Sequence, residues 1–170
     1  MTTNDSDSRS ALPSEGVLPE DFREAFSRWA TGVSIVAVRD PADAKVHATT
    51  VSSLASVSAV PPVLGFALGP GAQVLPFLPE ARRFVVNILA QGQASLATRY
   101  TDPFPVGPSP FPAEGQPVIP GTLARLHATV LGKVPVGSSR IVLGRVDAVE
   151  LGDADEPLLY FGRDYRRLSP

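Results

Sequence analysis

Hydrophobic and polar positions follow two different periods along the chain. In residues 123–134, small and aliphatic side chains alternate with the polar residues Arg125, His127, Thr129 and Lys133. A period of two is typical of a β-strand with one buried face. Shorter β-branched and apolar runs predict six more strands, at residues 33–38, 45–51, 63–68, 84–89, 141–149 and 158–161.

A helical period occurs near the start of the chain, in the segment PEDFREAFSRWATG. Pro19 suits the first helical turn, and Glu20 and Asp21 favour the positive end of the helix dipole. Gly32 is expected to end the helix. Its apolar residues share one face, which we expect to pack on a sheet: Phe22, Ala25, Phe26, Trp29 and Ala30. Two shorter helical pieces are predicted at about residues 72–78 and 94–100.

Many strands and few helices, with no regular βαβ order, predict a mainly β protein built as an antiparallel barrel. We expect one domain over residues 18–170, after a polar, disordered tail at residues 1–17. That tail has no basic and apolar segments of a signal peptide. The most apolar stretch, residues 57–68, is too short to span a bilayer, so a cytoplasmic protein is expected.

Proline and glycine are abundant, with 18 and 14 residues among 170. Seven of the prolines lie between residues 102 and 121. So dense a run excludes a helix or a central strand and predicts an extended surface loop. Long loops of this kind serve either as lids and binding loops or as plain connectors, and both alternatives stay open.

Charge and motif content exclude several classes of function. The net charge of −2 gives no basic footprint for nucleic acid or an anionic membrane, and no cysteine is present. Neither a GxSxG nor an HExxH motif occurs, nor a Walker or GxGxxG loop. No metal site is expected: His47 and His127 lack a second ligand at a suitable spacing, and His127 is expected to be solvated.

Hydroxyl-bearing residues are concentrated in the segment HATTVSSLASVS. Such side chains donate to phosphate or to the edge of a heteroaromatic ring without adding charge. They also serve simply to fill the outer face of a strand and its turn. The residues alone leave both interpretations open.

Five segments, taken in order, resemble the flavin reductase-like family over about residues 20–168. These segments are FREAFSRWATGVSIVAV, HATTVSSLASVSAVPPVLGFAL, RRFVVNILAQGQASLATRY, GTLARLHATVLGKVPVGSSRIVLGRVDAVE and PLLYFGRDYRRL. The resemblance implies a split β-barrel and an NAD(P)H-dependent reductase of FMN or FAD, with NADH or NADPH as co-substrate. It also implies a homodimer that supplies reduced flavin to a transient partner, a flavin-dependent monooxygenase.

The resemblance further implies roles for individual residues. Flavin contacts are expected from Val46, His47, Ala48, Thr49, Thr50, Ser52, Ser53, Ala67, Leu68, Gly69, Gln73 and Val74. Arg99 and Tyr100 are expected on the phosphate side of the flavin, where Arg99 is suited to bidentate pairing. The nicotinamide dinucleotide is expected near Ser139, Tyr160, Phe161, Gly162 and Arg163. Asn87 matches a family signature to which we assign a structural role.

Two segments depart from the family pattern. Gly137, Ser138 and Ser139 stand where many members carry Gly-Asp-His, and Ser139 has neither the charge nor the reach of an imidazole. Residues 69–72 are Gly-Pro-Gly-Ala, where members commonly carry Ser or Thr. An alternative is therefore a family member that keeps the barrel without reductase activity and binds flavin or a small apolar substrate. A purely structural or adaptor protein is less consistent with the sequence, which shows no charged stripe or exposed heptad.

Overall fold

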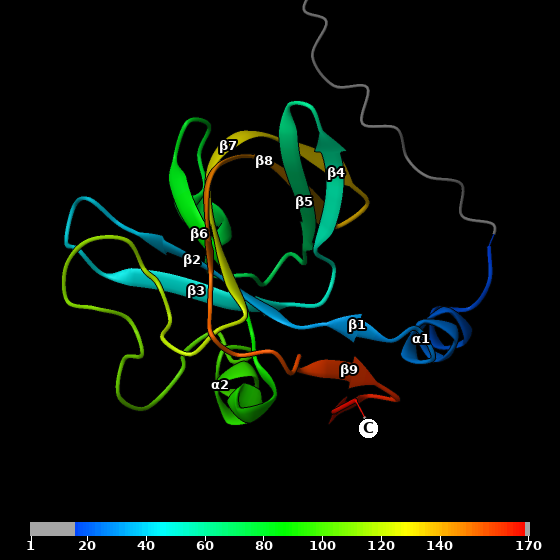
Figure 1. Cartoon of the computed structure of the whole chain (residues 1–170). Coiled ribbons are helices and arrows are strands. Elements are labelled where there is room, and N and C mark those ends of the chain that lie inside the picture. The colour runs from blue at the N-terminus through cyan, green and yellow to red at the C-terminus, as the bar shows by residue number, and fades with distance from the viewer. Residues whose placement is uncertain (1–15, 169–170) are drawn as a thin grey trace, which may run out of the picture.

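The fold is a seven-stranded antiparallel sheet that curls into a barrel, with a small three-stranded sheet beside it (Figure 1). The computed structural model describes residues 16–168. The barrel strands, in spatial order, are β3 (Val46–Val51), β2 (Ser34–Arg39), β6 (Arg83–Ile88), β7 (Ala124–Val136), β8 (Ser139–Leu151), β5 (Pro62–Leu68) and β4 (Ala55–Ala59). The small sheet contains β1 (Thr31–Gly32), β9 (Leu159–Phe161) and β10 (Asp164–Arg166). The helices are α1 (Pro19–Ser27) and α2 (Ala94–Arg99), with single 3₁₀ turns η1 (Leu75–Phe77) and η2 (Gln91–Gln93).

This architecture confirms the predicted barrel and each of the seven predicted strands, with boundaries shifted by up to two residues. The predicted disordered tail, residues 1–17, lies outside the described residues except for its last two, so it stays a prediction. Over residues 16–168, no helix is long and apolar enough to cross a membrane.

Strand β2 is buried on both faces, because its sequence SIVAV is apolar at nearly every position. Val36 and Val38 point into the barrel core, where the rings of Phe66 and Phe84 meet edge to face. Ile35 and its neighbours on the opposite face pack into a second apolar cluster under α2 and the C-terminal strands. Since β2 separates the two clusters, its partner β3 forms an edge of the sheet next to both.

Strands β7 and β8 form a long hairpin that supplies much of the barrel wall (Figure 1). At Gly144 the wall passes directly over a core ring: an added Cβ would lie 2.6 Å from Cζ of Phe84. Glycine is therefore required there for close packing rather than for a turn.

The proline-rich loop, residues 102–121, contains no strand or helix, as predicted, and lies beside the β2–β3 hairpin (Figure 1). Arg39 donates to three backbone carbonyls, at Ala44 (2.6 Å), Pro112 (2.6 Å) and Gly115 (2.8 Å). Arg99 donates to the carbonyl of Pro108 at 2.9 Å. The loop is thus fastened to the barrel by side chains, which limits its conformational freedom.

Asn87 fastens the far end of the same loop. Its side chain is fully buried and donates to the carbonyls of Ile35 (3.4 Å) and Pro117 (3.2 Å). It also accepts from the backbone N–H of Ile119 at 2.8 Å. The structural role assigned to Asn87 from the sequence is confirmed.

Helix α1 differs from its prediction. It ends at Ser27 rather than near Gly32, and no residue in it is buried. Phe22 and Phe26 are 54% and 60% exposed, and Trp29 just beyond the helix is 68% exposed. The prediction that this face packs on a sheet of the same chain is therefore wrong. Helical periodicity shows that a face is apolar, but it does not show what covers that face.

Candidate functional site

The free edge of β3 is the centre of the candidate site. The backbone N–H of Thr50 donates to the carbonyl of Tyr100 at 2.9 Å, on the side away from β2. Backbone groups alternate in direction along an antiparallel ladder, so the N–H and C=O of Ala48 also face this free edge. The Thr50 hydroxyl donates to the carbonyl of Ala97 at 2.7 Å. These two contacts fix the end of α2 against β3 and divide the free edge of β3 into two parts.

A larger cavity of about 790 Å³ lies beside the first half of β3. Val46, His47 and Ala48 line it from the strand. Gln73 and Phe77 line it from the segment after β5 and Tyr100 from the end of α2, and the proline-rich loop forms the opposite wall. Its volume is in the range of ligand pockets.

His47 lies flat against Phe77 in this cavity, with ring centroids 3.4 Å apart and an interplanar angle of 10°. Burial lowers the pKa of His47 below 6.5, and the nearby charge of Lys45 lowers it further. Asp40 and Asp43 oppose this shift. The imidazole is therefore held towards its neutral form, as a flat surface rather than a cation.

A smaller cavity of about 500 Å³ lies beyond Thr50. It joins residues predicted for flavin with residues predicted for the nicotinamide dinucleotide, namely Thr50 and Ser52 with Tyr160 and Arg163. Arg163 has a positive φ of 63° and donates to Glu24 of α1 at 3.1 Å. Burial raises the pKa of Tyr165, whose ring meets that of Tyr160 edge to face in this cavity.

Three threonine hydroxyls that line this cavity each donate to a backbone carbonyl. Thr50 donates to Ala97, and Thr98 and Thr101 donate to carbonyls of α2 at 3.1 Å and 2.6 Å. Because each proton is used internally, these hydroxyls offer lone pairs to a ligand as acceptors. Such a cavity suits an N–H donor on a flat heteroaromatic ring.

A third group of predicted residues meets at the end of β5. The Ser53 hydroxyl accepts from the N–H of Ala67 at 2.9 Å. Leu68 pairs with Arg140, which brings the adjacent Ser139 to the same end of the barrel. Gly69 follows Leu68 directly, so the chain returns from this point towards Gln73 and the larger cavity.

Comparison with known proteins gives a consistent family. Residues 26–169 match the model of the flavin reductase like domain. The reductase component of 4-hydroxyphenylacetate 3-monooxygenase from Thermus thermophilus is 36% identical over 155 residues, covering 89% of this chain and 97% of the relative. The actinorhodin polyketide dimerase of Streptomyces coelicolor is 31% identical over 151 residues, covering 86% and 85%.

A solved structure of similar shape is that of the NADH:FAD oxidoreductase SgcE6 from Streptomyces globisporus, in complex with NAD and FAD fragments. It has a TM-score of 0.78 and 28% identity, and the match covers 92% of this chain and 98% of that one. This chain belongs to the flavin reductase like domain family.

The structure places most of the predicted site residues around the two cavities and the end of β5, but Thr49, Phe161 and Gly162 line neither cavity. It also shows how the side chains of Val74, Leu68 and Arg99 lie. Val74 is fully buried in the barrel core, so its side chain is turned away from any ligand. Leu68 is also buried there. Arg99 is directed to the proline-rich loop at Pro108, so its guanidinium is positioned by that loop. Its contact with flavin phosphate stays a prediction, as do the other ligand contacts.

Several residues of the site were not predicted from the sequence. Phe77, Thr98, Thr101 and Tyr165 line the cavities, yet they lie far from β3 along the chain. Their assignment depends on the packing of α2 and the C-terminal strands against β3, which no local pattern indicates.

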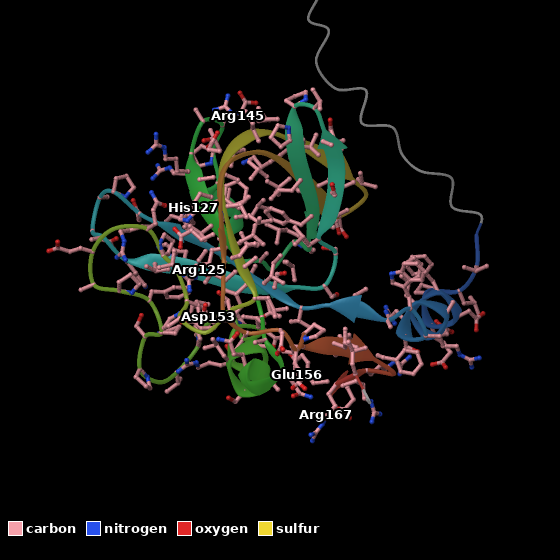
Figure 2. The ribbon with its side chains drawn as sticks, viewed as in Figure 1. Arg125, His127, Arg145, Asp153, Glu156 and Arg167 are labelled. Carbon is pink, nitrogen blue, oxygen red and sulfur yellow. The ribbon has the colours of Figure 1, made fainter. Side chains whose placement is uncertain are left out.

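His127 also differs from its prediction. It is not simply solvated: its side chain is 19% exposed and its Nε2 lies 2.8 Å from Oε1 of Glu150. Arg125 donates to the same carboxylate at 2.9 Å, and Figure 2 shows His127 and Arg125 near one another on the barrel. The hydrogen bonds from His127 and Arg125 lower the pKa of Glu150. The pairing arises because β7 and β8 bring positions 127 and 150 together across the ladder, which the spacing of the sequence does not reveal.

Few side chains that line the two cavities can act as a general acid or base near neutral pH. Among their lining residues in the described chain, the only carboxylate is that of Asp164 and the only imidazole is that of His47. Residues 16–168 also contain no cluster of three or more metal-ligating side chains. This composition suits a reaction that needs stacked rings and a water-poor surface more than it suits hydrolysis.

Proposed function

We propose that this protein is an NAD(P)H-dependent flavin reductase that reduces FMN or FAD and supplies reduced flavin to a partner monooxygenase. The observation that carries the proposal is the smaller cavity, where the residues predicted for the two ring systems meet. Hydride transfer requires the nicotinamide and the flavin to lie face to face, so a shared cavity is the arrangement that the reaction needs. The family and the names of its members support the same activity.

The residues fit the rings that the reaction uses. Thr50, Thr98 and Thr101 present acceptor lone pairs, which match the N–H groups of a flavin or of a carboxamide. Thr31 pairs with Tyr160 in β9, and its buried hydroxyl lacks a hydrogen-bond partner among the described residues. Buried polar groups are normally satisfied, so this position favours a further polar group nearby.

The chain's own part in the mechanism is to bind, orient and exclude water. A bound flavin supplies an acceptor for hydride, so no side-chain acid or base is strictly required. Tyr160 and Tyr165 provide aromatic surface beside the cavity, and Arg163 provides a cation held by Glu24. The hydroxyl groups around this cavity orient polar ring edges without adding charge.

The test is NADH oxidation by the purified chain in the presence of FMN or FAD, followed by the loss of NADH absorbance. We expect turnover with at least one flavin, well above a protein-free control. Rates equal to that control with both flavins and with both NADH and NADPH would contradict the proposal.

A second function is favoured by two observations. One relative of similar coverage is named for polyketide dimerisation, so the family includes members not named as reductases. In addition, Ser139 lies where a histidine is common, and it is next to the end of β5. A family member that binds flavin or a small apolar substrate without reductase turnover would show saturable ligand binding and no NADH oxidation. Fast turnover with free flavin excludes this alternative.

We also propose that the protein is a homodimer in which a second copy covers the exposed apolar face of α1. This face carries Phe22 and Phe26, whose ring centroids are 4.6 Å apart, and a large exposed apolar surface of this kind is unusual unless it is covered. Helix α1 is tied to the smaller cavity through Glu24 and Arg163, so a partner on α1 would border that cavity.

Light scattering measures the mass of the particle in solution. We expect twice the chain mass for the protein and for the control Arg23→Gln, and the monomer mass for the double variant Phe22→Ser and Phe26→Ser. A monomeric parent protein, or a double variant that still dimerises, would overturn this arrangement.

A further inference from the structure

The larger cavity is left without a redox ring if the proposed function is correct. Flavin and nicotinamide rings must lie in contact for hydride transfer, and residues predicted for both line the smaller cavity beyond Thr50, whereas the larger cavity contains residues predicted for flavin alone. The larger cavity lies at the other end of the same strand, beyond the contact between Thr50 and Tyr100. Ala48 lines the larger cavity and Thr50 the smaller one, so the contact between Thr50 and Tyr100 lies between them, and a ligand that uses both cavities must extend along β3 past this contact.

The charge of the larger cavity suits an anionic ligand. Its charged lining residues in the described chain are Arg39 and Lys45, both cationic, and no carboxylate lines it. Arg39 donates to three neutral carbonyls, which fix its position. Asp40 and Asp43 act on His47 from nearby, but they do not line the cavity. Phosphate groups are the natural complement of this arrangement.

The aromatic groups of the cavity suit a flat base. Phe104 lines the cavity from the proline-rich loop, and its side chain is 75% exposed. The stacked rings of His47 and Phe77 line it from the barrel side. An exposed aromatic ring on a fixed support is a suitable platform for a nucleobase, because stacking needs only a π-face.

Phe104 is held in position by the chain around it. Its backbone N–H donates to the carboxylate of Asp102 at 2.7 Å. Pro103 and Pro105 flank it and restrict the backbone to extended conformations. At Gly107 the loop approaches Arg99 so closely that an added Cβ would lie 2.7 Å from Nη1, and φ there is +123°. A wall ordered before binding adds little entropy cost when a ligand arrives.

We propose that the larger cavity binds the adenosine diphosphate portion of FAD, with the adenine stacked on Phe104 and the phosphates near Arg39 and Lys45. This inference rests on the proposed function. It assigns the proline-rich loop a specific role: the loop selects FAD over FMN, because FMN shares one of the two phosphates but lacks the adenosine monophosphate half whose base stacks on Phe104.

The test compares Phe104→Ala with Val106→Ala. Val106 is a matched control because it lies in the same loop and is 88% exposed, yet it does not line the cavity. For Phe104→Ala we expect the KM for FAD to rise about tenfold, with the KM for FMN changed less than about twofold, since one base-stacking contact is lost. Val106→Ala should leave both values unchanged.

Calorimetry with ADP gives a readout that does not depend on turnover. The parent protein and Val106→Ala should bind ADP, and Phe104→Ala should bind it about tenfold more weakly. Equal effects of Phe104→Ala on FAD and FMN, or ADP binding that is absent or unchanged in that variant, would overturn the inference. Failure of the proposed function is distinguishable, since it abolishes NADH oxidation with both flavins whatever the result with ADP.

Discussion

Replacing Asn87 with alanine tests whether one buried side chain holds the proline-rich loop on the barrel. The substitution leaves the N–H of Ile119 and the carbonyl of Pro117 without the side-chain partners that they have in the structure. Ile119 is 1% exposed, so water does not readily replace the lost acceptor. Each buried group left unsatisfied costs about 1–3 kcal/mol, so the free energy of unfolding should fall by about 3 kcal/mol. For a domain of this size that corresponds to a fall in Tm of roughly 6–12 °C.

Urea denaturation measures this free energy, and limited proteolysis within residues 102–121 reports whether the loop has loosened. Gln93→Ala is the control, because half-buried Gln93 also donates to a loop carbonyl, at Pro120, through an exposed hydrogen bond, while its side-chain oxygen accepts from the N–H of Ala90 outside the loop. We expect it to cost less than about 1 kcal/mol. A loss below about 0.5 kcal/mol for Asn87→Ala, with unchanged proteolysis, would refute the anchoring role.

Three further predictions address the core, the loop and the cavity. Gly144→Ala should lower the free energy of unfolding by about 1–3 kcal/mol through overpacking against Phe84, and an unchanged urea midpoint would contradict the close approach. Arg39→Met removes three hydrogen-bond donors and should speed protease cleavage of the loop about tenfold, which corresponds to the loss of roughly one net hydrogen bond. An unchanged cleavage rate would show that other contacts hold the loop. The pKa of His47 is lowered in the folded protein, so just below pH 6.5 the unfolded chain binds more protons than the folded one. The free energy of unfolding should therefore fall as the pH falls from 6.5 through the folded pKa of His47. Denaturation curves of His47→Gln should lack this part of the pH dependence, and the same pH slope in both proteins would be evidence against it.

Much of the barrel could be predicted from the sequence because its strands carry strong local patterns. The alternation in β7 indicates a strand with one buried face, and the apolar run in β2 indicates a strand buried on both faces. Strand β4 was not predicted, since Ala55–Ala59 is small and polar and forms a strand only by pairing with β5. Edge strands of this kind depend on a partner more than on their own propensity.

The candidate site was less accessible to prediction than the fold. The family resemblance placed Thr50 and Tyr160 in the site, but only the tertiary structure shows that they line one cavity. Likewise, the proline content predicted a loop but not that Arg39 and Asn87 fasten it. These contacts join positions more than 25 residues apart, so they follow from packing and not from any local period.

The central claim is hydride transfer from a nicotinamide to a flavin held by this chain. Anaerobic mixing of the protein, FMN or FAD, and a limiting amount of NADH tests it most directly. The account predicts bleaching of the flavin absorbance, with one flavin reduced for each NADH oxidised and a rate proportional to the concentration of protein. A flavin spectrum that does not change faster than in the protein-free mixture would contradict it.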